Sequence, residues 1–294
     1  MTFWTDTLGM AFEIKFVDAG GTRTRTMIAG KGEAIVFLHG ISGHLEAYVS
    51  SARAFVDAGF QVHLIDQIGQ GFTDKLTEPM TAKIMADHVI RYMDAVGLKK
   101  AHLAGLSLGG WTAAWVAAHY PERVISLQLL SAAGDPDSKP AKDPKIGEWL
   151  RKSTRDGVLG DWEATKKRLL TVVTDATKLT DELVDVRHAI YKQPAFIAGL
   201  DNLMAMTSPE TFTPWALTKE VLGKIQCEVL VIWGENDYAM GDGPKFLVEG
   251  IKKVKLVTFA GNGHWPQFEK PAEYAQVAIA FLKGGLANVK VSKM

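Results

Sequence analysis

The sequence is short of the features that mark several large classes of protein. It contains one cysteine, Cys227, among 294 residues, so no internal disulfide can form and nothing points to an oxidising compartment. No apolar run approaches the about 18 residues that a membrane-spanning helix needs. The N-terminal stretch carries Asp6 and Glu13 and lacks a basic start, which argues against a signal peptide. We therefore expect a cytoplasmic protein without a membrane partner.

The sequence also lacks an excess of charge of either sign. Lys and Arg together number 33, and so do Asp and Glu, which gives a formal net charge of zero. A chain without a basic excess has no global field that would recruit nucleic acid. Neither Cys-x-x-Cys nor His-Glu-x-x-His occurs, and no complete dinucleotide fingerprint is present. We expect a small-molecule substrate, no nucleic-acid partner, no metal and no cofactor, and a homodimer is compatible with the sequence.

What the sequence does contain is a regular alternation of strand and helix patterns, which predicts an α/β fold. Several expected strands are apolar throughout, as in strands buried on both faces of a parallel sheet. Helical patterns between them imply right-handed crossovers, whereas Gly20-Gly21 joins the first two strands as an antiparallel hairpin at one edge. The expected eight strands cover 12–18, 22–28, 33–39, 61–65, 101–106, 124–130, 228–233 and 254–259, and the helices 46–58, 81–96, 108–119, 243–251 and 271–282.

The alternation stops after the sixth expected strand. Residues 134–214 show helical patterns and no convincing strand, and prolines mark both ends of the stretch. We interpret 134–214 as a helical cap inserted between the sixth and seventh strands. Residues 1–133 and 215–294 would then form one α/β core.

The sharpest motif is Gly-Leu-Ser-Leu-Gly-Gly at residues 105–110, between an expected strand and an expected helix. In that context Gly-x-Ser-x-Gly predicts a nucleophile elbow, a tight turn that exposes Ser107 at the top of the sheet. The dipole of the following helix favours negative charge developing there. Ser107 is the candidate nucleophile.

A serine hydroxyl needs a base to take its proton and an acid to orient that base. In this architecture the acid and then the histidine follow the serine along the chain. Asp237 follows the expected strand 228–233, and His264 follows the strand 254–259. Both therefore fall at the carboxyl ends of parallel strands, where α/β proteins place catalytic groups. Glu235 and Asp242 are weaker candidates for the acid.

The loop after the third expected strand is the candidate oxyanion hole. It begins His39-Gly40-Ile41-Ser42. The expected donors are the backbone N–H groups of Leu108 and Ile41, with the Ser42 hydroxyl as a further contact. His39 is expected to hold the loop in place rather than to act as a base.

Over nearly its whole length the chain resembles the α/β-hydrolase superfamily, and within it the meta-cleavage product hydrolases, which cut carbon–carbon bonds in ring-opened aromatic compounds. The finer resemblance lies in residues 263–269 and in the cap stretch 181–187 followed by Pro194-Ala195-Phe196. It implies that Arg187 binds the substrate carboxylate or keto-acid end and that Trp265 forms a wall of the substrate pocket.

The chain departs from that family pattern beside the serine. The family usually has asparagine before its serine, where this chain has Leu106 in the substrate pocket, and the oxyanion loop continues Ile41-Ser42-Gly43-His44. Leucine cannot hydrogen-bond a dienol, so it favours an aromatic monoester or a lactone as substrate. A carbon–carbon hydrolase, a carboxylesterase and a non-catalytic ligand-binding receptor of the same fold thus remain the alternatives.

Overall fold

The computed structural model describes residues 2–138, 143–237 and 243–290. These residues form an eight-stranded sheet in the order β1-β2-β4-β3-β5-β6-β7-β8, with neighbours from β4 to β8 parallel and β2 antiparallel to both β1 and β4. The predicted α/β class, with its antiparallel hairpin at one edge, is confirmed. The strands are β1 (Phe12–Asp18), β2 (Arg23–Ala29), β3 (Ala34–Leu38), β4 (Gln61–Ile65), β5 (Ala101–Leu106), β6 (Val124–Leu130), β7 (Glu228–Gly234) and β8 (Val254–Phe259).

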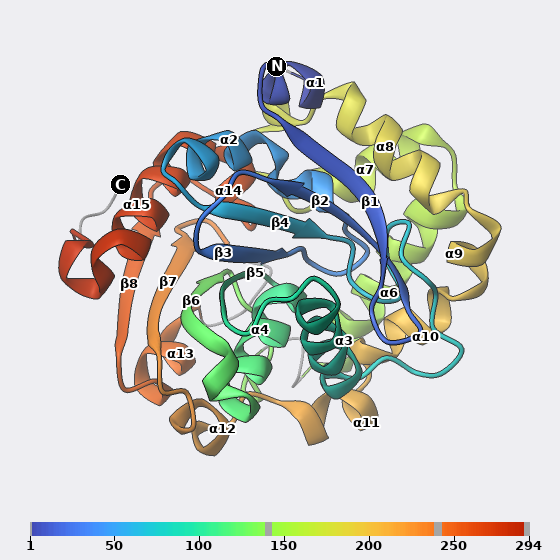
Figure 1. Cartoon of the computed structure of the whole chain (residues 1–294). Helices are drawn as coiled ribbons and strands as arrows, with labels where there is room; N and C mark the ends of the chain where they lie inside the picture. The colour runs from blue at the N-terminus through green and yellow to red at the C-terminus, as the bar shows by residue number, and fades with distance from the viewer. Residues whose placement is uncertain (1, 139–142, 238–242, 291–294) are drawn as a thin grey trace.

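Helices cover both faces of the sheet (Figure 1). Alternate residues of the central strands point to opposite faces, so Val36 and Leu38 join one hydrophobic cluster while Ile35 and Phe37 join the other. The first face packs against α3 (Ala82–Ala95), α4 (Leu108–His119), α12 (Lys219–Gly223) and α13 (Lys245–Gly250); the second packs against α2 (Val49–Asp57) and α15 (Pro271–Gly284). The short helices α1 (Phe3–Thr7) and α14 (Pro266–Glu269) complete the core.

The described residues between β6 and β7 form helices joined by turns and loops, and no strand lies among them. These helices gather beside one end of the sheet, at the right of Figure 1. Three of them begin at side-chain caps: Asp143 accepts from the N–H of Lys145 at α6, Asp161 from that of Ala164 at α7, and Thr180 from that of Leu183 at α8. The set comprises α6 (Pro144–Leu159), α7 (Trp162–Leu170), α8 (Asp181–Tyr191), α9 (Pro194–Ala198), α10 (Leu200–Met204) and α11 (Pro209–Phe212).

Strand register brings the segments of the site to one edge of the sheet. Leu38 pairs with Gly105, and Leu106 pairs with Leu130. The carboxyl ends of β3, β5 and β6 therefore lie level, and β7 and β8 continue the same parallel edge.

Where element bounds differ from the expected ones, two differences have a clear physical cause. The predicted helix 46–58 starts as a 3₁₀ turn (Leu45–Tyr48) before α2, because the Asp66 carboxylate takes the N–H of Leu45 at 2.7 Å. The second strand lies one residue later than predicted. Gly20 and Gly21, with φ of 63° and 85°, form the turn, and pairing resumes only at Arg23.

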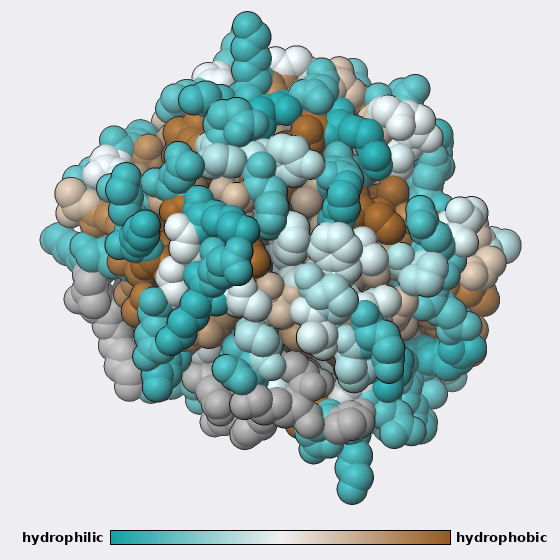
Figure 2. Space-filling model, turned by 90° about the horizontal axis from the view of Figure 1, so that it is seen from below, coloured by the Kyte–Doolittle hydropathy of each residue, from teal (hydrophilic) through white to brown (hydrophobic). Residues whose placement is uncertain are grey.

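The visible surface gives little sign of a large apolar interface. Figure 2 shows one face on which hydrophilic residues dominate and hydrophobic ones are scattered. Within the described ranges, no helix combines the length and apolar character needed to cross a bilayer.

Candidate active site

Ser107 occupies a strained turn between β5 and α4. Its φ of 53° and ψ of −115° are unusual for a residue with a side chain. Glycine is required on both sides, because a Cβ on Gly105 would lie 2.2 Å from the Gly109 carbonyl oxygen, and one on Gly109 would lie 2.1 Å from that of Leu38. The turn is therefore the elbow that the motif predicted, with Ser107 in the wall of a cavity.

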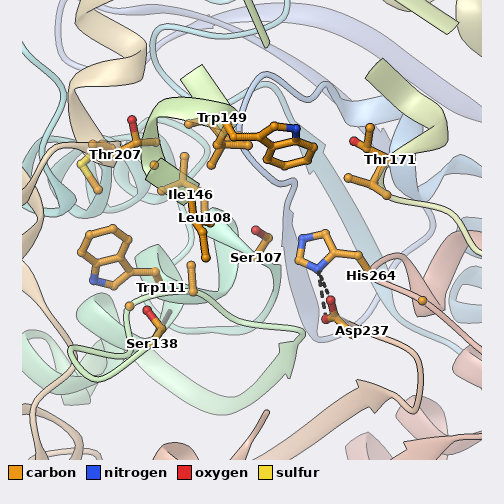
Figure 3. A pocket seen from close by; sticks show the side chains of 18 of the residues that line it. Ser107, Leu108, Trp111, Ser138, Ile146, Trp149, Thr171, Thr207, Asp237 and His264 are labelled. Atoms are coloured by element: carbon orange, nitrogen blue, oxygen red, sulfur yellow. Dashed lines mark hydrogen bonds and ion pairs between the residues drawn. The ribbon is translucent and has the colours of Figure 1, made fainter. Parts of the chain in front are cut away.

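Asp237 and His264 meet in the loops that follow β7 and β8. The His264 Nδ1–H donates to both Asp237 carboxylate oxygens, at 3.2 and 3.1 Å. Both side chains are buried. Figure 3 shows the other ring nitrogen of His264 on the side of the cavity where Ser107 lies. The three residues that the sequence singled out thus line one cavity.

The competing acids fare differently. Glu235 is exposed, and its carboxylate accepts from the N–H of Gly261 at 3.2 Å. Asp242 lies outside the described residues. Of the acids that can be compared, only Asp237 contacts the His264 ring.

The loop after β3 approaches the serine. Ile41 and Leu108 both line the cavity beside Ser107. Within the described part of the chain, neither backbone N–H donates a hydrogen bond. Two N–H groups next to one serine can bind an oxyanion.

Ser42 does not line the cavity with them. Its φ is 55° and its side chain is buried. The Ser42 hydroxyl accepts from the Tyr191 phenol at 3.0 Å, and its carbonyl oxygen accepts from Arg187 Nη1 at 2.7 Å. The structure therefore joins Ser42 to helix α8 instead of directing its hydroxyl at Ser107.

His39 holds the loop as a neutral ring. Its Nδ1–H donates to the Gly40 carbonyl at 2.8 Å, and its Nε2 accepts from the N–H of Gln67 at 3.1 Å. Burial lowers the pKa of His39 to about 4. A ring that must accept at Nε2 cannot be protonated there, so this histidine is structural, as predicted.

The cavity in front of Ser107 is large and mainly apolar. Its volume is about 640 Å³. Trp111 from α4 forms part of its wall, and Ile146, Trp149 and Leu150 from α6 also line it (Figure 3). Trp149 is 54% exposed. Apolar positions on a helix carry no sequence signal that separates cavity walls from core, so these residues were not predicted.

A second, smaller cavity of about 30 Å³ adjoins the first at Ser107, His264 and Ile41. Leu106, Trp265 and Arg187 line it, as does Arg168 from α7. The sequence pointed to the first three residues, whereas Arg168 was missed because it lies in an ordinary amphipathic helix. Arg168 is the only one of the four that lines both cavities.

Arg187 is buried without a full set of partners. Its side chain is 2% exposed. Nη1 donates to Ser42 and, at 3.3 Å, to the Tyr191 oxygen, but Nε and Nη2 have no hydrogen-bond partner in the structure as described. Unmet donors on a buried cation favour an anion in this small cavity.

The described residues include no group of three or more His, Cys, Asp or Glu side chains that could hold a metal ion. The single cysteine, Cys227, lies in a partly buried position. Burial raises the pKa of Cys227 to about 11.

Comparison with known proteins places this geometry in a family. The family model for the alpha/beta hydrolase fold matches residues 33–271. The chain is an α/β hydrolase. Residue order, sheet topology and the glycine-lined serine turn all agree with that assignment.

Two relatives of this α/β hydrolase belong to one group of enzymes. The chain is 33% identical over 261 residues to a 2-hydroxy-6-oxo-6-phenylhexa-2,4-dienoate hydrolase of Comamonas testosteroni, covering 87% of this chain and 89% of the relative. A 2-hydroxy-6-oxononadienedioate/2-hydroxy-6-oxononatrienedioate hydrolase of the same organism is 31% identical over 264 residues, covering 87% and 90%.

A solved structure agrees. The meta-cleavage product hydrolase of Pseudomonas fluorescens IP01, in a mutant form complexed with acetates, superposes with a TM-score of 0.76 at 25% identity, covering 92% of this chain and 97% of that one. The chain is therefore a hydrolase of the α/β-hydrolase fold, related to the meta-cleavage product hydrolases.

Proposed function

We propose that this chain is a serine hydrolase that cleaves a carbon–carbon bond next to a ketone in a ring-opened, aromatic-derived carboxylic acid. The observation that carries the proposal is the pair of joined cavities at Ser107. The small one holds unpaired Arg187 donors and suits a carboxylate, and the large apolar one suits the remainder of the substrate. The relatives named above act on acids of this kind.

In the proposed mechanism Ser107 Oγ attacks the ketone carbon while His264 takes its proton. Asp237 orients the imidazole through Nδ1–H and stabilises its charged form. The N–H groups of Leu108 and Ile41 bind the oxyanion. The carbon–carbon bond breaks, the leaving carbon receives the proton from His264, and an acyl-enzyme remains. Water activated by His264 then releases the acid.

Cleavage of the carbon–carbon bond requires a leaving carbon that can carry the electron pair. A 2-hydroxydienoate fulfils this requirement once its dienol has become a 2-oxo acid, because the electron pair can then delocalise to the 2-oxo oxygen as an enolate. Arg187 beside Trp265, with its guanidinium carbon 5.8 Å from the ring centroid, would bind the carboxylate end.

Residues 134–214 are proposed to act as the cap of the site. Their helices supply much of the large cavity's wall, including Ile146, Leu150 and Phe212. Specificity for the apolar part of the substrate would then reside in this segment. The homodimer allowed by the sequence stays a prediction.

A carboxylesterase for aromatic monoesters is the second candidate, favoured by Leu106. This side chain is fully buried, lines the small cavity and offers no hydrogen bond. Ester cleavage needs the same acyl-transfer groups and no dienol contact.

Parallel assays separate the two functions. Ring-fission dienols are followed by loss of their colour and aromatic monoesters by acid release, each as kcat/KM. Faster cleavage of a dienol supports the carbon–carbon proposal, and faster hydrolysis of every monoester tested contradicts it. A serine-directed phosphonate that leaves Ser107 unlabelled in folded protein would contradict both and favour a binding receptor.

A further inference from the structure

A second buried arginine faces the site. Arg168 on α7 is 7% exposed and lines both cavities. The established family assignment gives it no role, and the proposed mechanism above does not use it.

Arg168 is held in one orientation. Nε donates to the Thr154 hydroxyl at 3.2 Å, and Nη1 donates to the Thr171 hydroxyl at 2.8 Å. Helix α6 makes room for its stem at Gly157, where a Cβ would lie 2.8 Å from the Arg168 Cβ. Nη2 donates to no group of the described chain. Two hydrogen bonds thus fix the Arg168 guanidinium, and Nη2 is the nitrogen that remains for a ligand.

Among the described residues that line the two cavities, the one carboxylate is that of Asp237, which is paired with His264. No carboxylate of the described residues forms an ion pair with Arg168 or Arg187. Burial, together with the positive charge of Arg187, lowers the pKa of Arg168. Burial alone would raise the pKa of the Tyr191 phenol, but Arg187 and Arg168 hold it below its usual value. Two buried cations without a counter-ion are costly, and a ligand with two acidic oxygen groups would offset that cost.

The other polar side chains that line the small cavity are Ser107, His264, Trp265 and His39. The first two belong to the proposed catalytic machinery, and both ring nitrogens of His39 are already used, so the arginines are the permanently charged donors beside this cavity. At about 30 Å³ the cavity accepts a few polar atoms and is too small for an aromatic ring.

We propose that Arg168 and Arg187 together bind the head of a 2-oxo or 2-hydroxy (enol) carboxylic acid, with Arg187 at the carboxylate and Arg168 at the neighbouring oxygen. This rests on the proposed function, in which the site takes a carboxylic acid. Arg168 is thereby a specificity-determining residue that distinguishes a 2-oxygenated acid from a simple one and stabilises the enolate form of the head.

The test measures binding of inert ligands by isothermal titration calorimetry. In wild-type protein 2-oxohexanoate should bind at least about tenfold more tightly than hexanoate, the effect expected of one charged hydrogen bond. Arg168→Met should remove most of that preference and change hexanoate binding less than about threefold. Arg155→Met is the matched control, since Arg155 is exposed and ion-paired with Asp201 at 2.6 Å, and it should keep the preference.

Two results would overturn the inference directly: equal affinities of the two acids for wild-type protein, or an equal loss of affinity for both in Arg168→Met. A third would be Arg168-dependent binding of heptanedioate that is tighter than that of 2-oxohexanoate, because Arg168 would then bind a second carboxylate in the large cavity. Near-UV circular dichroism checks that Arg168→Met is folded. Where it is not, Arg168→Lys takes its place: it keeps the charge but cannot keep both threonine hydrogen bonds, and it should weaken the preference for 2-oxohexanoate, whereas an unchanged preference would overturn the inference. Because nothing is hydrolysed, the preference can persist in a protein that fails every turnover assay, and that result would refute the proposed function alone.

Discussion

The Arg187 guanidinium donates a hydrogen bond to the Ser42 carbonyl oxygen at 2.7 Å, joining helix α8 to the loop after β3. Ser42 itself adopts a left-handed backbone conformation with φ of 55°. One arginine therefore fixes a strained residue next to Ile41 and also lines the small cavity, with Nε and Nη2 lacking a hydrogen-bond partner among the described residues. If Arg187 binds the substrate as proposed, substrate binding and the position of this loop are coupled.

Replacing Arg187 by alanine should raise KM for carboxylate-bearing substrates by about tenfold or more, and for neutral esters much less, because a charged hydrogen bond to the anion is lost. Steady-state kinetics on paired anionic and neutral substrates measures the difference. Tyr191→Phe is the matched control. It removes the bond to Ser42 at 3.0 Å but keeps the charge, so it should not alter the anionic preference. Equal KM changes for both substrate types would show that Arg187 is no anion-binding residue.

Ser107→Ala should lower kcat by at least about a thousandfold while leaving the fold intact, because the nucleophile is removed and only binding and the oxyanion donors remain. Turnover and phosphonate labelling followed by mass spectrometry check it. Ser138 is a second serine in the same cavity wall, and Ser138→Ala should retain both activity and labelling. Activity near the wild-type value in Ser107→Ala would refute the assignment.

Asp237→Asn should reduce kcat by about 10⁴-fold with little change in KM, because an amide can stabilise the wrong tautomer of His264 and cannot balance the imidazolium charge. The measurement is kcat against pH on the preferred substrate. Glu235→Gln, at the exposed acid two residues earlier, should behave as wild type. A larger loss from Glu235→Gln than from Asp237→Asn would reverse the roles.

Leu106→Asn should increase the ratio of dienol cleavage to monoester hydrolysis, by about tenfold, since the new amide would donate a hydrogen bond in the small cavity where leucine offers none. Parallel kcat/KM values for the two substrates give the ratio. The substitution places an amide at a fully buried position, so the melting temperature should fall. An unchanged ratio in the folded variant would mean that the residue at position 106 does not determine which of the two reactions is faster.

Stability should fall as the pH is lowered below about 6.5, because several histidines are buried as neutral rings. Burial lowers the pKa of His88 to about 3. Its Nδ1 accepts from the N–H of Ile68 at 3.3 Å, while Nε2 bonds the Thr24 hydroxyl at 2.8 Å. The unfolded ring titrates near 6.5 and so binds a proton first. Its stabilisation is complete above that pH and is lost toward pH 3, at up to about 1.4 kcal/mol per pH unit.

Urea unfolding at pH 7 and pH 5 tests this. His88→Gln should show a shallower pH dependence than wild type, whereas His119→Gln, at an exposed position, should leave the slope unchanged. An identical slope in His88→Gln and wild type would show that His88 is not the titrating group.

Much of the fold could be read from local pattern. Five of the eight strands have the bounds that were predicted. Three of them, β4, β5 and β6, are largely buried runs of the kind typical of strands covered on both faces. The elbow was equally local. Gly105 and Gly109 are required by carbonyl oxygens that would touch any Cβ there, so the motif and its strand–helix context determine the turn.

The site was less accessible to sequence. Ser107, Asp237 and His264 could be nominated because strand ends of a parallel sheet converge at one edge. The orientation of the Ser42 hydroxyl could not be predicted, because it depends on Tyr191 and Arg187, which lie in a helix almost 150 residues later. The walls of the large cavity could not be predicted either, because the sequence pattern of a helix with one apolar face is the same whether that face packs in the core or lines a cavity.

The sequence by itself therefore determined the α/β class, the elbow and the order of the candidate catalytic residues, since these follow from periodicity, glycine sterics and chain order. Only the tertiary structure decided which cations share the small cavity. Arg168 and Arg187 lie on two different helices. Neither local sequence indicates that the two side chains line the same small cavity, with no carboxylate among the described residues paired to either. Charge balance in a protein interior is a property of contacts in space, and those exist only once the helices are packed.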